Sequence, residues 1–367
     1  MKKTIWWAVG IVAIVIIAIL LSSQKEPTTK TLKIGMLLPL SGSAAQYGEQ
    51  IKNGAEIYRK RLADEGRNIE IIYEDNKADP ATAISAYRKL IDIDRVDYMV
   101  SAMTRATIPL IDLVKQDKVP MIMTLVAGDW DKAKTGYVVR FYPTARQYVR
   151  SDDENKVLNG LSSVGVIYVN DEYGQSVFRE IQKFSVEKGF KIGIAESYLP
   201  NNQDYRLLLS KIKSAGIDLI MMISSSPVEL SAISKQYKEL GIKQKLFDAS
   251  IGLSNPNVRL NNADILEGVV TRATEAELPD KDSSAEEFFI KYKDLYNKDP
   301  YFPGIFGYET INLINVIDLQ ESEDFIAKIS DIKALKTIMG DLVVEDYQEI
   351  NPSIYNAIIK NGKLIRL

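Results

Sequence analysis

The sequence predicts an α/β protein with two lobes, each a doubly wound parallel sheet that carries helices on both faces. The chain has 367 residues, too many for one ordinary domain and about right for two. From residue 32 onward, short β-rich runs alternate with amphipathic stretches, an order typical of parallel sheets. The alternation restarts near residue 164, which indicates a second unit of the same kind.

The first unit begins with a β-rich run that Pro39 ends. Apolar residues at helical spacing follow it, and Pro80 stands near the start of the next helix, where proline is tolerated. An alternating stretch, Tyr137–Pro143, is a candidate for a strand that crosses between the lobes. We expect strands at 32–38, 69–73, 96–101 and 119–125, and helices at 44–64, 80–93 and 108–116.

The second unit repeats this architecture without obvious repetition of sequence. We expect strands at 164–169, 190–197, 217–223 and 246–249, and helices at 174–188, 204–215 and 228–240. After a run at 268–271 come expected helices at 285–296 and 305–319 and strands at 342–345, 354–360 and 363–367. Asn361-Gly362 separates the last two strands and is a strong hairpin signal.

The N-terminus carries an apolar run, Ile5–Leu21, behind Lys2 and Lys3. Its roughly 17 residues are at the short end of what spans a bilayer, and the basic end should stay cytoplasmic. The run ends Leu-Leu-Ser-Ser-Gln, a poor match to a cleavage site, and no Cys is present for lipid attachment. We therefore expect an uncleaved membrane anchor, with a cleaved signal peptide as the alternative. The Pro-containing stretch 22–31 is typical of a short linker.

The composition argues against most enzyme classes. The chain has no Cys and no His, which excludes thiolate and imidazole metal sites, disulfides and the usual nucleophile–base pairs. It also has no glycine-rich nucleotide fingerprint and no G-x-S-x-G motif, so we expect no catalysis and no cofactor. The net charge of -3, with both signs interspersed, gives no footprint for nucleic acid.

Polar residues follow the strands of the first unit at their carboxyl ends, where open α/β sheets bind ligands. Ser41 follows the first strand, and Tyr47 lies in the next turn. Thr104, Arg105 and Thr107 follow the third strand, where free backbone N–H groups suit an anionic group. Helix capping is the alternative role for Thr107, and plain solvation is the alternative for Arg105.

The second unit has candidates at equivalent places. Tyr173 follows its first strand and could project into a cleft, and Ser225 follows a later strand. Pro227 favours plain helix capping at that turn, and Asp248 at the next strand end could face either a ligand cation or solvent. Two sheets that face each other would place both sets of loops on one cleft, which is the geometry of a hinged clamp.

A set of short motifs in a fixed order gives the chain a family resemblance. They are Ile34–Gly42, Tyr47-Gly48, Asn53-Gly54-Ala55, Tyr73–Asn76, Asp79-Pro80, Ala83, Lys89-Leu90-Ile91, Lys118–Ile122, Asn170–Gly174 and Gly307–Thr310. Over nearly all of residues 32–367, they resemble the type I periplasmic solute-binding proteins of ABC importers, specifically the leucine/isoleucine/valine-binding group.

The resemblance implies discontinuous lobes that three strands join at a hinge. We expect residues 1–31 to form the anchor or signal segment and linker. Residues 32–143 with 272–335 would form lobe 1, and residues 144–271 with 336–367 would form lobe 2. The resemblance also implies ligand roles for Ser41, Tyr47, Thr104, Thr107, Tyr173 and Ser225.

Three loops depart from the family pattern. The third loop, usually Gly-Pro-x-Ser-Ser or similar, reads Ser101–Arg105 here. The loop that normally carries a Thr for an α-carboxylate reads Thr124–Gly128, and Leu125 is its candidate ligand contact. Amino-acid binders keep an acidic residue where this chain has Ile251, and Asp248 is the nearest acid. The departures leave the ligand class open.

The sequence therefore predicts an extracytoplasmic protein that binds a small polar solute, an amino acid or related carboxylate, and delivers it to an ABC importer. Its expected partners are the permease and ATPase subunits and the membrane, through the N-terminal helix, with no nucleic acid. A repressor would begin with a basic helix-turn-helix, and this chain begins with an apolar segment. The alternative is a ligand-sensing receptor subunit of the same fold that acts through a partner protein.

Overall fold

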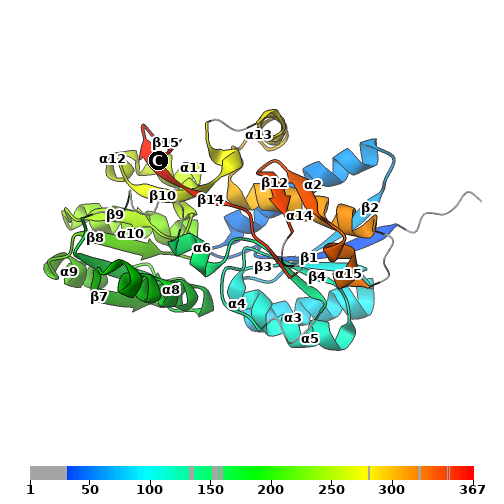
Figure 1. The fold of residues 1–367 in the computed structure, drawn as a ribbon, viewed down its shortest axis with the longest axis horizontal. Helices are drawn as coiled ribbons and strands as arrows, with labels where there is room; N and C mark the ends of the chain where they lie inside the picture. The colour runs from blue at the N-terminus through cyan, green and yellow to red at the C-terminus, as the bar shows by residue number, and fades with distance from the viewer. Residues whose placement is uncertain are drawn as a thin grey trace, which may run out of the picture. The chain divides into compact units, whose positions relative to one another are not determined.

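The first sheet has six strands in the described part of the chain, in the order β13-β5-β4-β3-β1-β2 (Figure 1). β1, β3, β4, β5 and β13 pair in parallel. The strands are β1 Leu32–Leu38, β2 Ile69–Asp75, β3 Tyr98–Ala102, β4 Met121–Thr124, β5 Val138–Phe141 and β13 Glu349–Ile350. β1, β3, β4 and β5 are almost wholly buried, which is why they read as continuous apolar runs in the sequence.

Helices cover both faces of this sheet (Figure 1). One face carries α2 (Ala45–Asp64) and α14 (Phe302–Asp318), and the other carries α3 (Pro80–Arg88), α4 (Thr104–Thr107) and α5 (Ile111–Asp117). α2 and α14 approach each other so closely that a Cβ on Gly54 would lie 1.9 Å from the carbonyl oxygen of Gly304. The glycine allows this approach because it has no side chain. The remaining elements of this part of the chain are α13 Ser283–Tyr296, α15 Phe325–Ser330 and the hairpin β11 Ala334–Thr337 with β12 Gly340–Val343.

The second sheet has the order β15-β14-β10-β9-β8-β6-β7 among the described residues. β7, β6, β8, β9 and β10 pair in parallel, and β14 and β15 add an antiparallel edge. The strands are β6 Ser163–Val169, β7 Lys191–Tyr198, β8 Leu219–Ile223, β9 Lys245–Asp248, β10 Val270–Thr274, β14 Ile354–Lys360 and β15 Lys363–Arg366. The predicted hairpin turn is confirmed, since Asn361 and Gly362 have φ of 49° and 71°.

Most helices of the second lobe follow strands of its sheet: α8 Glu172–Lys188, α9 Arg206–Ser214, α10 Pro227–Glu239, α11 Pro256–Asn261 and α12 Ala263–Leu266. α6 Ala145–Val149 instead lies between β5 of the first sheet and β6 of the second. Aliphatic residues of α9 and α10 pack on β6 and β8 in one apolar core that includes Leu209, Ile212, Leu230 and Ile233. The prediction of two α/β lobes built on parallel sheets is therefore confirmed.

Two expected helices are broken in the structure. The stretch expected as 108–116 consists of a 3₁₀ turn, Ile108–Leu110, followed by α5, and the short helix α4 precedes it. Pro109 within the turn has no N–H to donate, so the α-helical ladder cannot continue through it. The stretch expected as 80–93 ends in a π-helical turn, Lys89–Asp94, which Arg95 closes with a φ of 53°.

The chain passes between the two sheets after β5, after β10 and after β13, as the strand order requires. The stretch Tyr137–Pro143 is not itself a crossing strand, because β5 pairs with β4 and β13 inside the first sheet. The predicted boundary between residues 271 and 272 falls inside β10, which pairs with β9 and β14 of the second sheet. β13, which the prediction assigned to lobe 2 within 336–367, pairs with the first sheet.

The computed structural model describes residues 31–131, 136–150, 157, 160–279, 282–320, 324–344, 346 and 348–367. The predicted N-terminal anchor lies outside the described residues. Within these ranges, no helix combines the length and the apolar character that a bilayer crossing needs.

Candidate functional site

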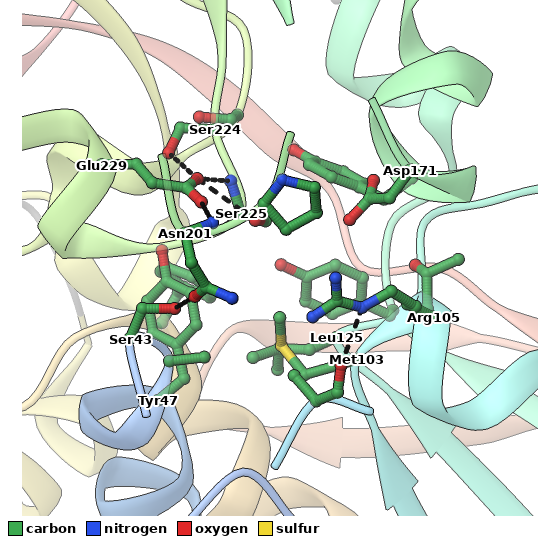
Figure 2. Close-up of a pocket in the computed structure, with 18 of the residues that line it drawn as sticks. Ser43, Tyr47, Met103, Arg105, Leu125, Asp171, Asn201, Ser224, Ser225 and Glu229 are labelled. Atoms are coloured by element: carbon green, nitrogen blue, oxygen red, sulfur yellow. Dashed lines mark hydrogen bonds between the residues drawn. The ribbon is translucent and has the colours of Figure 1, made fainter. Parts of the chain in front are cut away.

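A cavity lies between the loops that follow the strands of the two sheets (Figure 2). Its empty space is about 640 Å³, including the part continuous with solvent. Both lobes line it, with Ser43, Ala44, Tyr47, Ala78, Met103, Thr104, Arg105, Leu125, Tyr142, Tyr148, Asp171, Tyr173, Pro200, Asn201, Ser224, Ser225, Glu229, Ser250 and Phe302. The predicted cleft between strand-end loops is therefore present, and six of the nine predicted site residues line it.

Arg105 provides the positive charge of the cavity. It lies on α4, which begins after Met103 at a φ of 78°. Its Nε donates to the carbonyl oxygen of Ala78 at 2.7 Å, and its terminal nitrogens point into the cavity (Figure 2). The neighbouring Thr104 is buried and also lines the cavity. This placement suits recognition of a carboxylate, which the planar guanidinium binds in a two-point geometry.

An aromatic wall, formed by Tyr47, Tyr142, Tyr148, Tyr173 and Phe302, lines the cavity. The ring centroids of Tyr47 and Phe302 lie 5.4 Å apart, and those of Tyr148 and Tyr173 lie 6.3 Å apart. The Tyr148 hydroxyl donates to the Tyr142 hydroxyl at 2.6 Å. Burial raises the pKa of Tyr47, Tyr148 and Tyr173, so these phenols are neutral at physiological pH. The wall offers apolar ring faces together with hydroxyl donors.

Asp171 faces Arg105 from the second lobe (Figure 2). Its carboxylate caps α8 by accepting from the backbone N–H of Gly174 at 3.0 Å. Burial raises the pKa of Asp171, while the Gly174 N–H and the charge of Arg105 act in the opposite direction. Asp171 can therefore accept a hydrogen bond from a hydroxyl or an ammonium group of a ligand.

Glu229 is a buried carboxylate that organises the second lobe's side of the cavity. Its side chain accepts from the Tyr198 hydroxyl at 3.2 Å, the Ser224 hydroxyl at 3.1 Å and the Ser225 backbone N–H at 3.1 Å. The Ser225 hydroxyl and the Asn201 backbone N–H donate to it at 3.2 and 3.1 Å (Figure 2). These five donors replace the water that burial removes from the carboxylate. Glu229 thereby fixes both the Ser224-Ser225 turn and the Asn201 loop.

The lobes contact each other directly on two sides of the cavity. The Ser43 hydroxyl donates to the Asn201 side-chain oxygen at 2.6 Å, and Asn255 Nδ2 donates to Gln46 Oε1 at 3.2 Å. Elsewhere, the Asp129 backbone N–H donates to the Ser176 hydroxyl at 3.1 Å, and Arg179 pairs with the Asp129 carboxylate at 3.0 Å. These bonds define a closed arrangement of the two lobes.

Three predicted site residues do not line the cavity. Ser41 is exposed and donates to Asp75 Oδ2 at 2.6 Å. Thr107 is buried, 2.7 Å from the Ser101 hydroxyl. Asp248 is fully buried and accepts from the Ser250 N–H and hydroxyl, the Leu253 N–H and the Thr271 hydroxyl. Because their polar groups are already bonded within the protein, this placement does not favour the predicted contacts, and their ligand roles stay predictions.

The sequence reasoning missed most of the aromatic wall and the polar groups of the second lobe. Tyr142 follows β5 directly, so the rule that used strand ends could have found it. Glu229 lies one turn into α10, and Phe302 opens α14, so no local pattern marks either as a cavity residue.

Two α/β lobes close over a cavity that has a charged group and aromatic faces. This is the arrangement of a ligand-binding protein of the hinged-clamp class. The sequence matches the family described as periplasmic binding protein over residues 31–346, so the chain belongs to that family. Membership in this family of binding proteins confirms the prediction that the chain is not an enzyme.

Relatives and solved structures agree with this assignment. The chain is 25% identical over 301 residues to the leucine-, isoleucine-, valine-, threonine- and alanine-binding protein of Pseudomonas aeruginosa, covering 78% of this chain and 77% of that protein. It is 23% identical to the Leu/Ile/Val-binding protein homolog 2 of Brucella abortus, covering 93% and 92%. The branched-chain amino acid transporter substrate-binding protein LivJ from Streptococcus pneumoniae, in complex with isoleucine, shares the fold at a TM-score of 0.81 and 20% identity, covering 91% and 98%.

Another solved structure shares the fold and holds a different ligand. A solute-binding protein of an ABC transporter from R. palustris, in complex with benzoate, has a TM-score of 0.82 at 17% identity, covering 92% of this chain and 95% of that one. The predicted resemblance to the Leu/Ile/Val-binding proteins of ABC transporters is confirmed.

Proposed function

We propose that this protein captures a small carboxylate in its interlobe cavity and delivers it to an ABC importer. The observation that carries the proposal is the Arg105 guanidinium, which points into a cavity that both lobes line. In a partly dry site, a charge-assisted hydrogen bond contributes about 1.5–3 kcal/mol. The relatives named for branched-chain amino acids and the structure that holds benzoate support a carboxylate as the shared chemical group.

The rest of the cavity defines two ligand classes. The aromatic wall suits a ring or a branched aliphatic chain, because either buries apolar area against it. Asp171 would accept from the ammonium group of an amino acid or from the hydroxyl of an aromatic acid. The carboxylate of an amino acid and that of an aromatic acid would therefore both bind Arg105. The two ligand classes differ in the group that donates to Asp171, an ammonium group in one and a hydroxyl in the other.

A thermal-shift screen of the full chain tests the proposal. The panel pairs each acid with a neutral analogue: isoleucine with isoleucinamide, benzoate with benzamide, and 3,4-dihydroxybenzoate with catechol. Stabilisation by the acids, confirmed by isothermal titration, with no response to the partner that lacks the carboxylate, is the expected result. Equal stabilisation by an acid and its neutral analogue would show that Arg105 does not bind a ligand carboxylate. Loss of uptake of the identified acid in a gene-deletion strain tests delivery.

We propose that the three passages between the sheets, which follow β5, β10 and β13, act as the hinge. Their place in the chain order supports this, because each connects an element of one sheet to an element of the other. We further propose that lobe 2 includes all of β10, since that strand pairs on both sides within the second sheet. Domain-motion analysis of liganded and ligand-free crystals would test both boundaries.

We also propose that the mature protein keeps its apolar N-terminus as a membrane anchor. The support is the run Ile5–Leu21 behind Lys2 and Lys3 and the poor cleavage site that follows it. The intact N-terminus should be found by mass spectrometry in the membrane fraction. A soluble product that begins near Ser23 or Lys25 would contradict the anchor and indicate a cleaved signal peptide.

A further inference from the structure

Arg140 and Glu349 form a buried ion pair beside the cavity. Arg140 Nε and its second terminal nitrogen donate to the two carboxylate oxygens of Glu349, each at 2.7 Å. Their side chains are only 7% and 5% exposed. Arg140 lies on β5 and Glu349 on β13, and these two strands pair in parallel. A two-point pair in this setting is rigid in both distance and angle.

The pair also holds the 125–130 loop, the segment of residues 125–130 that follows β4. The other terminal nitrogen of Arg140 donates to the carbonyl oxygen of Gly128 at 2.7 Å and contacts that of Val126 at 3.4 Å. The indole N–H of Trp130 donates to Glu349 at 3.0 Å. Both partners of the pair therefore bond to the loop, Arg140 through the nitrogen that Glu349 leaves free and Glu349 through the oxygen that also accepts from Arg140.

The 125–130 loop connects the cavity to the second lobe. Leu125 lines the cavity at a φ of 52°. Ala127 accepts through its carbonyl oxygen from the N–H of Ala145, at the start of the first passage between the sheets. Asp129 bonds to Ser176 and Arg179 of α8 in the second lobe. A shift of this loop would therefore change a cavity wall and an interlobe contact together.

We propose that the Arg140–Glu349 pair positions the 125–130 loop for ligand capture, and so sets ligand affinity and lobe closure without touching the ligand. The inference rests on the proposed function, in that closure around a solute is what the positioning serves. Glu349 begins β13, whose second and last residue, Ile350, directly precedes residues 351–353, the last passage between the sheets. The pair thus fixes the loop to the strand from which the chain crosses to the second lobe.

The decisive variant replaces both partners together, Arg140→Met with Glu349→Met. Apolar residues of similar volume commonly replace a buried ion pair without loss of stability, whereas removal of one partner leaves a buried charge. The double variant therefore keeps the strand pair packed while it removes the bonds to Gly128 and Trp130. Trp130→Phe is a milder second variant, since it removes only the indole N–H bond. A matched control is Arg67→Met with Asp318→Met, a partly buried pair between the segment that follows α2 and the last residue of α14.

Closure is measured on the full chain with two nitroxide labels. The sequence has no Cys, so Lys115→Cys on α5 and Lys235→Cys on α10, both exposed, give unique labels on the two lobes. The distribution of distances between the two labels is recorded by pulsed electron paramagnetic resonance without a ligand, with isoleucine and with benzoate. Amide hydrogen exchange of the 125–130 loop and the affinity for whichever acid binds are measured in parallel.

We expect the double variant to melt near the wild-type temperature, to populate longer label distances, to bind about tenfold more weakly and to exchange its loop amides at least about tenfold faster. Trp130→Phe should change the label distances, the affinity and the loop exchange in the same directions but by smaller amounts. The control variant Arg67→Met with Asp318→Met should change none of them. Wild-type distances and loop exchange in both loop variants would overturn the inference. If the double variant does not fold, Trp130→Phe decides alone. If the wild type binds neither acid, the proposed ligand class fails, and the ligand-free distances and exchange still decide the positioning role.

Discussion

The hydroxyl of Ser43 in the first lobe lies 2.6 Å from the side-chain oxygen of Asn201 in the second, at the edge of the cavity (Figure 2). The backbone N–H of Asn201 is held in turn by Glu229 at 3.1 Å. One interlobe hydrogen bond is therefore backed by a buried carboxylate of the second lobe. The bond links the two lobes in the closed arrangement.

Ser43→Ala should weaken ligand binding by about 2- to 12-fold, because one neutral hydrogen bond contributes about 0.5–1.5 kcal/mol to the closed state. Isothermal titration with the acid found in the screen measures the change. Ser85→Ala, which removes only a hydroxyl bonded within α3, is the matched control and should leave affinity unchanged. Equal dissociation constants for the wild type and Ser43→Ala would show that this bond contributes nothing to closure.

Arg105→Ala should weaken binding of the acid by about 10- to 150-fold, the equivalent of about 1.5–3 kcal/mol. Thr107→Ala should instead lower the free energy of unfolding by about 1–3 kcal/mol and leave affinity unchanged, because it strands the buried Ser101 hydroxyl. Titration and urea unfolding of both variants separate the two effects. An unchanged dissociation constant for Arg105→Ala would exclude Arg105 as the carboxylate contact.

Asp171→Asn should distinguish the two ligand classes. Removal of a negative charge near Arg105 should tighten binding of a simple carboxylate at neutral pH and weaken binding of an amino acid, whose ammonium group would lose its partner. Each dissociation constant should change several-fold, and isothermal titrations of Asp171→Asn with benzoate and with isoleucine measure the change. Identical affinities of the variant and the wild type for every bound acid would exclude Asp171 from ligand recognition.

The same variant tests the raised pKa of Asp171. A carboxyl whose pKa is higher in the folded state contributes stability below its ordinary pKa of about 3.9 and loses it as pH rises through the folded value. Above that folded pKa the charged carboxylate of Asp171 opposes folding, so Asp171→Asn should melt higher than the wild type there. The difference should shrink as pH falls toward 4. A difference that does not vary with pH would contradict the shift.

Glu309 should make the stability of the first lobe depend on pH near neutrality. Burial raises its pKa to about 7, and its carboxylate accepts from Asn312 Nδ2 at 2.7 Å and from the Ile338 N–H at 2.8 Å. The protonated Glu309 side chain therefore stabilises the folded state. This stabilisation is fully present below about pH 4.3 and is lost as pH rises through 7, a change of about 3 kcal/mol in the free energy of unfolding. Urea unfolding of the wild type and Glu309→Gln between pH 4 and 8 should show it as a pH-dependent difference.

Gly54→Ala should lower the free energy of unfolding by about 1–3 kcal/mol, because its Cβ would lie 1.9 Å from the carbonyl oxygen of Gly304 and force α2 and α14 apart. Thermal and urea unfolding measure the loss. Gly136→Ala is the matched control, since its Cβ would meet the nearest atom at 3.4 Å. Equal losses in the two variants would show that helix separation is not the cause.

The sequence by itself determined the order of strands and helices and the kind of loop that forms the site. The runs at 32–38 and 164–169 could be predicted because buried parallel strands need continuous apolar residues, a local property. Arg105 and Tyr173 could be found because ligands bind at the carboxyl ends of such strands. The hairpin at Asn361-Gly362 followed from two residues that accept positive φ.

Only the tertiary structure decided which polar groups face the cavity. Asp248 and Glu229 are both carboxylates near strand ends of the second sheet, yet only Glu229 lines the cavity, while Asp248 turns toward Thr271 and the Leu253 N–H. That choice depends on which donors the fold brings within hydrogen-bonding distance of each carboxylate, and some of them, such as Asn201 for Glu229 and Thr271 for Asp248, come from distant parts of the chain. Likewise, Glu349 stands 209 residues from Arg140, and only the pairing of β13 with β5 brings them together.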